Sequence, residues 1–378
     1  MRHLFSLSAA LLAGLTASHA AKADELKIVT SIAPLHSLIT QVTGDLADVS
    51  FLVKGAESPH SFSLKPSDRL QLAEADFIFL IDGQFEMSLA KAAKGDDRFI
   101  SYTSTPDLRL LPYRHQDDFM MASAADDDHN EHGHHDHGHD EHGHKDHHDD
   151  HGHDEHGHKD HHDGHGHDDH GHDEHGHDDQ GHKDHHDEHG HDDHDEHDHG
   201  NSPHDLHIWL DPENAKAMLA YTAQILGVGD PANAAIYTAN ATAAIADITR
   251  WNTLLSEDLH DAHETGFVTY HDAFQYLELA YDLHVIGTIL DGHATQATAA
   301  TLAQLQHVIE TGQVSCVFQE PQFEALSLAA LDSHDEVVTA KLDPLGSDLT
   351  PGPQLYQQLI TGMVDEIAHC SEEGHHHH

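Results

Sequence analysis

Residues 126–200 consist almost wholly of His, Asp, Glu and Gly and hold 30 of the 49 histidines of the chain. The unit DEHGHKDHH occurs at residues 140–148 and again at 154–162, and none of its positions is apolar. Such a segment has no face to bury, so nothing offsets the entropy lost when it becomes ordered. We expect this histidine tract to be a mobile loop, and the fold to be built from the residues on either side of it.

The composition of the tract predicts the kind of metal ion that it binds. Imidazole nitrogen suits zinc, copper, nickel and iron, and the interleaved carboxylates add oxygen ligands, so the tract predicts divalent metal binding without choosing one metal. We expect many weak, interchangeable sites. Their candidate accessory ligands include His129, His132, His134, His139 and His199.

The chain is strongly acidic, with a formal net charge of −51. The tract contributes 28 acidic residues against three lysines, and the remainder of the chain is acidic as well. This balance argues against nucleic acid or an anionic lipid surface as a partner and favours cations, whose local concentration a negative field raises.

Residues 1–23 have the pattern of a secretory signal peptide. A basic start precedes an apolar run at residues 4–17, and small residues follow it, so cleavage is expected before Ala21 or Asp24. The apolar run is too short for a permanent membrane span, so we expect an exported protein without direct membrane insertion. The histidines at 375–378 resemble a purification-tag remnant, and we set them aside.

Cys316 and Cys370 are the only cysteines. In an oxidising compartment a lone pair far apart in sequence is most simply one disulfide. A metal site is the less favoured alternative, because the two thiols lack the C-x-x-C spacing.

Outside the tract, short apolar strands alternate with amphipathic helical segments, which predicts an α/β fold with parallel sheets. Residues 231–261 contain no internal Gly or Pro after Pro231 and predict one long helix. We therefore expect an N-terminal lobe at 24–230, a rigid linking helix at 231–261 and a C-terminal lobe at 262–374. A short strand is expected at 207–210.

Ligands of such folds sit at the carboxyl ends of strands, which directs attention to four residues. His60 follows the strand predicted at 49–53, His207 adjoins the short strand, His271 follows 266–269, and Asp343 follows 337–342. Three imidazoles and one carboxylate form a suitable zinc shell. Glu320 and Asp272 are more readily interpreted as carboxylates that orient a ligand histidine.

Five segments carry a resemblance to a known family. The segments ESPHSFSLKPSD (57–68), HIWLDP (207–212), YHDAFQYLE (270–278), CVFQEPQF (316–323) and LDPLG (342–346) occur in this order. They resemble the periplasmic zinc-binding proteins of ABC importers, the ZnuA type within the wider zinc and manganese solute-binding protein family. The histidine tract resembles the charged loop of the zinc-specific members.

The resemblance implies that His60, His207 and His271 bind the metal, with Asp343 as a possible fourth ligand. It also implies a disulfide between Cys316 and Cys370 and a rigid linking helix. Some zinc members have Glu immediately before the first histidine, whereas this chain has Pro59. That departure favours Asp343 or water as the fourth ligand, with Glu57 more remote. His204, three residues before His207, is a possible accessory ligand.

The resulting functional prediction is a periplasmic Zn²⁺-binding protein, not an enzyme, that delivers zinc to an inner-membrane ABC permease as a monomer. The tract would act as a scavenger, a buffer or a sensor, of which we favour scavenging. The alternatives are a manganese- or iron-binding protein of the same fold, a periplasmic zinc store, and a zinc hydrolase. The hydrolase is least favoured, because the catalytic zinc signature H-E-x-x-H does not occur in the sequence.

Overall fold

The computed structural model describes residues 25–114, 119, 202–259, 262, 265–296, 298–323 and 337–375. All of them belong to one of the two units into which the chain divides, formed by residues 1–129 and 199–378. The predicted signal peptide, the histidine tract with its candidate ligands, and residues 376–378 lie outside the described residues.

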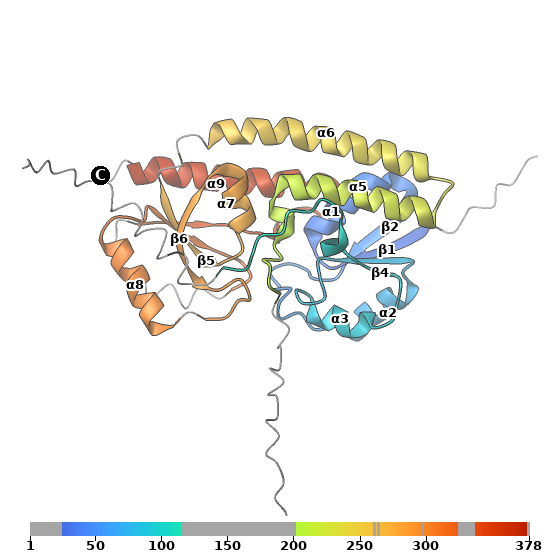
Figure 1. The fold of residues 1–378 in the computed structure, drawn as a ribbon, viewed down its shortest axis with the longest axis horizontal. Helices are drawn as coiled ribbons and strands as arrows, with labels where there is room; N and C mark the ends of the chain where they lie inside the picture. The colour runs from blue at the N-terminus through green and yellow to red at the C-terminus, as the bar shows by residue number, and fades with distance from the viewer. Residues whose placement is uncertain are drawn as a thin grey trace, which may run out of the picture. The chain divides into compact units, whose positions relative to one another are not determined.

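Two four-stranded sheets, both wholly parallel, form the framework (Figure 1). The first sheet has the order β2-β1-β3-β4 and the second the order β6-β5-β7-β8. The strands are β1 (Leu26–Thr30), β2 (Ala47–Phe51), β3 (Phe77–Leu80), β4 (Phe99–Ser101), β5 (Gly266–His271), β6 (His284–Leu290), β7 (Cys316–Gln319) and β8 (Val338–Lys341). Two parallel α/β lobes, as the sequence predicts, are therefore confirmed.

Helices connect most of the strands, and three further helices in the described residues lie between the two sheets in sequence or after the last strand. They are α1 (Ala33–Thr43), α2 (Pro66–Glu74), α3 (Met87–Ala93), α5 (Pro212–Gly229), α6 (Ala234–Asp258), α7 (Gln275–Tyr281), α8 (Ala299–Glu310) and α9 (Leu355–His375). Several begin where the sequence signals a start. Pro66 opens α2, and Pro212 opens α5, where the Asp211 side chain accepts a hydrogen bond from the Glu213 backbone N–H at 2.8 Å.

β5 is the strand that most directly supports the site. All six of its residues are buried, as expected for a central parallel strand covered on both faces. It ends at His271, so the strand delivers a histidine to the carboxyl edge of the second sheet.

The long helix α6 begins at Ala234, three residues later than predicted, because residues 231–233 form a turn. It packs along α5, α1 and α9 (Figure 1). The helix itself is thus as the sequence predicts within a few residues at each end. Its role as a rigid link, and the lobe boundaries drawn from it, remain predictions.

The segment after His207 differs from the prediction. Residues Ile208–Leu210 form a 3-10 helix, η4, and not a strand. The Trp209 indole N–H donates to the Pro344 carbonyl at 2.8 Å, and the Tyr356 hydroxyl donates to the Trp209 carbonyl at 2.8 Å. These tertiary bonds hold the apolar run in a tight turn, an outcome that a short apolar run cannot reveal by its periodicity.

A continuous hydrophobic core joins the two sheets. One buried cluster runs from Ile28 and Phe79 of the first sheet, through Trp209, to Phe267 and Phe318 of the second. A smaller cluster lies between the second sheet and α8. The predicted disulfide is confirmed: Cys316 of β7 pairs with Cys370 of α9.

Candidate metal centre

Three histidines from distant parts of the sequence meet at one point. His60 lies in the loop that follows β2, His207 immediately precedes η4, and His271 ends β5. One ring nitrogen from each residue lies within 4.8 Å of the others. The ring centroids are 4.9 to 5.4 Å apart, so the imidazoles surround a common space.

The walls of this space are mainly apolar. Phe85 packs edge-on against His60 and His207, with ring centroids 4.7 and 5.3 Å apart, and Phe323 packs edge-on against His271 at 5.4 Å. Trp209 lines the same pocket. These aromatic rings restrict the rotation of the imidazoles and exclude water from their sides.

Asp205 fixes the orientation of the His207 ring. Its carboxylate oxygen Oδ1 lies 2.7 Å from Nδ1 of His207 and also accepts a bond from the His207 backbone N–H at 2.9 Å. Because an ionised carboxylate only accepts, the contact assigns the ring proton to Nδ1 and leaves the lone pair on Nε2. Burial raises the pKa of Asp205 to about 6.

Glu320 lies beside His271: its Oε2 is 3.5 Å from Nδ1, an ion-pair contact, and both side chains are buried. Burial by itself would lower the pKa of His271, but the Glu320 carboxylate, together with Asp272 and the Gly292 backbone, outweighs burial, and the pKa is raised. Glu320 thus increases the basicity of the ring that it contacts.

The other two histidines are held neutral. Burial, together with the neighbouring His271, places the pKa values of His60 and His207 well below the usual value for imidazole. Nε2 of His60 and Nε2 of His271 are buried and have no hydrogen-bond partner among the described residues. A metal ion bound by three imidazole nitrogens satisfies these atoms, so the residues present fit a zinc-type centre.

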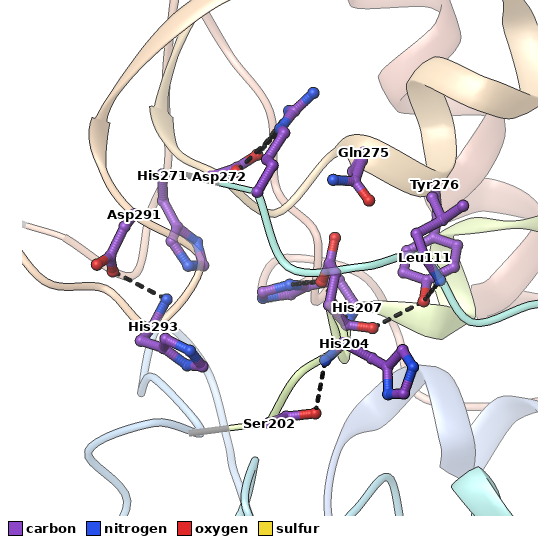
Figure 2. A network of polar contacts seen from close by, with 12 residues as sticks. Leu111, Ser202, His204, His207, His271, Asp272, Gln275, Tyr276, Asp291 and His293 are labelled. Carbon is purple, nitrogen blue, oxygen red and sulfur yellow. Dashed lines mark hydrogen bonds and ion pairs between the residues drawn. The ribbon is translucent and has the colours of Figure 1, made fainter. Parts of the chain in front are cut away.

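The remaining candidate ligands are not in this group. Both carboxylate oxygens of Asp343 accept hydrogen bonds from nearby groups. Glu57 forms an ion pair with Lys65 at 3.4 Å. His204 lies in an isolated β-bridge with Pro112, and its ring points away from His271 (Figure 2).

The two described segments that flank the histidine tract are joined close to the centre. Residues 111–113 pair with residues 203–205 through two backbone hydrogen bonds, Tyr113 N–H to Pro203 C=O at 2.9 Å and Asp205 N–H to Leu111 C=O at 3.0 Å. We call this pairing the stem ladder. The Tyr276 hydroxyl accepts from the Leu111 N–H at 3.0 Å and donates to the Asp205 carbonyl at 2.7 Å (Figure 2).

Arg114, next to the stem ladder, ties this segment to the second sheet. Its guanidinium binds Asp272 through Nε at 3.0 Å to each oxygen, and binds Glu278 through Nη1 at 2.9 Å. Asp272 directly follows His271 in the sequence, and burial raises the pKa of Asp272 although Arg114 opposes the rise. Asp272 therefore forms an ion pair with Arg114, whereas the carboxylate of Asp205 orients the His207 ring.

Sequence reasoning missed Asp205, Phe85 and Arg114. A carboxylate two residues before a candidate ligand was a usable signal for Asp205. Phe85 and Arg114 gave no local signal. Phe85 contacts His60 in a separate loop and His207 more than a hundred residues away, and the partner of Arg114, Asp272, is also more than a hundred residues away.

The chain is similar to known zinc-uptake proteins. The family model for the zinc-uptake complex component A, periplasmic, matches residues 28–370. The high-affinity zinc uptake system protein ZnuA of Brucella abortus (strain 2308) is 33% identical over 371 residues, covering 97% of this chain and 98% of that protein. The protein of the same name from Paracoccus denitrificans (strain Pd 1222) is 34% identical over 356 residues, covering 94% of each.

Solved structures agree in fold. A crystal structure of ZnuA has a TM-score of 0.61 and 21% identity, and covers 92% of this chain and 100% of that one. A zinc-bound 138-173 deletion mutant of ZnuA has the same TM-score and identity and covers 92% and 98%. At this identity the solved structures bear on the fold alone.

Proposed function

This chain belongs to the periplasmic zinc-uptake component A family, and on that premise we propose that it binds Zn²⁺ outside the inner membrane and delivers it to the permease of an ABC importer. None of the described helices is long and apolar enough to cross a membrane. We further propose export by the signal peptide at residues 1–23 and action as a monomer.

The observation that supports the proposal most strongly is the convergence of three imidazoles within 4.8 Å of one another. We assign His60, His207 and His271 as the ligands. A shell of nitrogen donors matches zinc better than manganese, whose sites favour carboxylate oxygen, so zinc is the preferred cargo over manganese. The role is binding and release, with no bond made or broken in the cargo.

The centre brings its ligands from two sheets, and this arrangement suits a carrier. His60 follows a strand of the first sheet, whereas His271 ends a strand of the second. Movement of one sheet relative to the other changes the distances between these rings and so weakens the centre. We propose that such a movement accompanies transfer to the permease.

For the histidine tract we propose a scavenging role. Many weak sites close to the centre raise the local concentration of metal and shorten the search for it. The stem ladder supports this role, because it joins described residues on either side of the tract, 111–113 and 203–205, and its residue Asp205 contacts His207.

Retention of zinc tests the proposal. Protein lacking residues 126–200 and the terminal histidines is loaded with zinc, dialysed exhaustively against a weak chelator and analysed for metal content. We expect one retained zinc, lost in His60→Ala and in His271→Ala. His307→Ala, which alters an exposed histidine on α8, is the matched control and should retain the metal.

Failure of the shortened protein to retain zinc would make the tract the principal binder, and the role would then be storage or buffering. Equal loss in His307→Ala would show that histidine content, and not the centre, governs retention. A retained manganese or iron in a competition with zinc would favour the alternative cargo.

A further inference from the structure

Asp343 is held by four hydrogen bonds, two to each carboxylate oxygen. Oδ1 accepts from Gln322 Nε2 at 2.8 Å and from the Leu345 N–H at 3.1 Å. Oδ2 accepts from the N–H and the hydroxyl of Ser347, both at 2.6 Å. Four bonds occupy the lone pairs of an ionised carboxylate, so neither oxygen is available to a metal while they persist.

Asp343 nevertheless belongs to the surroundings of the centre. Its bonding partner Gln322 lines the pocket together with the three histidines, as do the next two residues, Pro344 and Leu345. Asp343 is therefore a carboxylate near the metal centre that local bonds hold back.

We propose that Gln322 and Ser347 act as a latch that keeps Asp343 off the metal and thereby sets the selectivity of the centre for zinc over manganese. The inference rests on the proposed function, since it takes the three histidines as ligands. It assigns two specificity-determining residues, neither of which need touch the metal.

The chemistry of the two metals gives the latch its effect. Manganese favours carboxylate oxygen, whereas zinc accepts a shell dominated by imidazole nitrogen. A centre limited to three imidazoles disfavours manganese, and an added carboxylate reduces that disadvantage. Two of the four bonds come from the backbone turn after Asp343, so only the Gln322 and Ser347 side chains are open to change by substitution.

The test uses the full chain with Gln322→Leu and Ser347→Ala combined, which removes two bonds with little change in volume. Zn²⁺ and Mn²⁺ are titrated separately against a competing chelator, and free Mn²⁺ is followed by electron paramagnetic resonance. One hydrogen bond to a charged group corresponds to about a tenfold change or more in an equilibrium constant. We expect the manganese-to-zinc affinity ratio to rise by about tenfold or more.

Two further variants make the result specific to Asp343. Adding Asp343→Ala to the double variant should return the ratio to its original value. Ser347→Thr, which keeps the hydroxyl, should leave the ratio unchanged, and so should Gln304→Leu on the exposed face of α8. The histidine tract is identical in every variant, so a difference between variants arises elsewhere in the chain.

An unchanged ratio in the double variant would overturn the latch. So would a loss of zinc affinity in Asp343→Ala alone, because Asp343 would then already be a ligand. Adding His271→Ala to the double variant separates the two proposals. If metal binding is unaffected, the proposed three-histidine centre itself is wrong. If metal binding depends on His271 but the manganese-to-zinc affinity ratio is unchanged in the double variant, only the latch is rejected.

Discussion

Arg114→Met should destabilise the protein far more than a typical surface substitution. The Arg114 guanidinium forms ion pairs with Asp272 and Glu278, and all three side chains are at least four-fifths buried. Methionine keeps much of the aliphatic length but leaves two buried carboxylates without their cation. Breaking a buried ion pair in this way costs about 3–5 kcal/mol of unfolding free energy.

Urea denaturation measures this cost as the difference in extrapolated unfolding free energy. The matched control is Arg250→Met, because Arg250 pairs with Asp247 at 2.7 Å but both side chains are exposed. An exposed pair of this kind contributes roughly 1 kcal/mol or less. The two variants thus make the same chemical change in buried and exposed settings.

The loss in Arg114→Met should also depend on pH. Burial raises the pKa values of both Asp272 and Glu278 even with Arg114 present. A carboxyl whose folded pKa is raised binds its proton more tightly in the folded state, so its ionisation costs stability as pH rises. The loss should therefore be larger at pH 8 than at pH 5. A loss below about 1 kcal/mol, or one independent of pH, would refute this reasoning.

Three other predictions concern separate parts of the molecule. Glu86 is buried and its pKa is raised to about 7 by burial, so its contribution to stability should fall as pH rises from about 4.5 to 7. In urea titrations at several pH values, Glu86→Gln should reduce the fall of the unfolding free energy with rising pH. An unchanged dependence on pH would contradict a raised pKa for Glu86. Replacing Cys316 and Cys370 by alanine opens a link between residues 54 apart and should cost about 4 kcal/mol, seen as a lower urea midpoint; a cost under about 1 kcal/mol would count against it. Zinc stoichiometry of the histidine tract, compared between the full chain and the shortened protein, should be lower at pH 5.5 than at 7.5, because free imidazole protonates near about 6.5; equal values would exclude imidazole as the ligand.

Much of the framework follows from local sequence signals. Alternating apolar runs and helix starts at Pro66 and Pro212 predict the α/β order, and the strand-end rule leads directly to His60 and His271. These positions follow from backbone topology, since parallel strands present their carboxyl ends at one edge of a sheet. Local patterns of this kind are present in the sequence before any tertiary contact forms.

Other features depend on partners far along the chain. Residues 207–210 read as a strand, yet bonds to Pro344 and Tyr356 hold η4 as a tight turn. β4 escapes prediction because it has only three residues, FIS. Arg114 and Asp272 are 158 residues apart, so no local pattern links them.

Asp343 illustrates a third limit. An Asp before Pro can bond its own turn or a metal, and both outcomes place the same residue at the end of β8. The bonds from Leu345 and Ser347 realise the turn, and Gln322 adds a bond from a different segment. The sequence does not reveal the Gln322 contact, so it cannot predict how the Asp343 side chain is held.

The stem ladder has a consequence for how this protein can change in length. Tyr113 and Pro203 are joined by one hydrogen bond, so the part of the chain between them, which includes the histidine tract, begins and ends at almost the same place. The entropy of closing a flexible loop grows only with the logarithm of its length, and each doubling costs about 0.6 kcal/mol. Repeats such as DEHGHKDHH can therefore be gained or lost with little effect on the fold. If the tract binds metal as proposed, its capacity grows with the number of repeats, independently of the affinity of the centre.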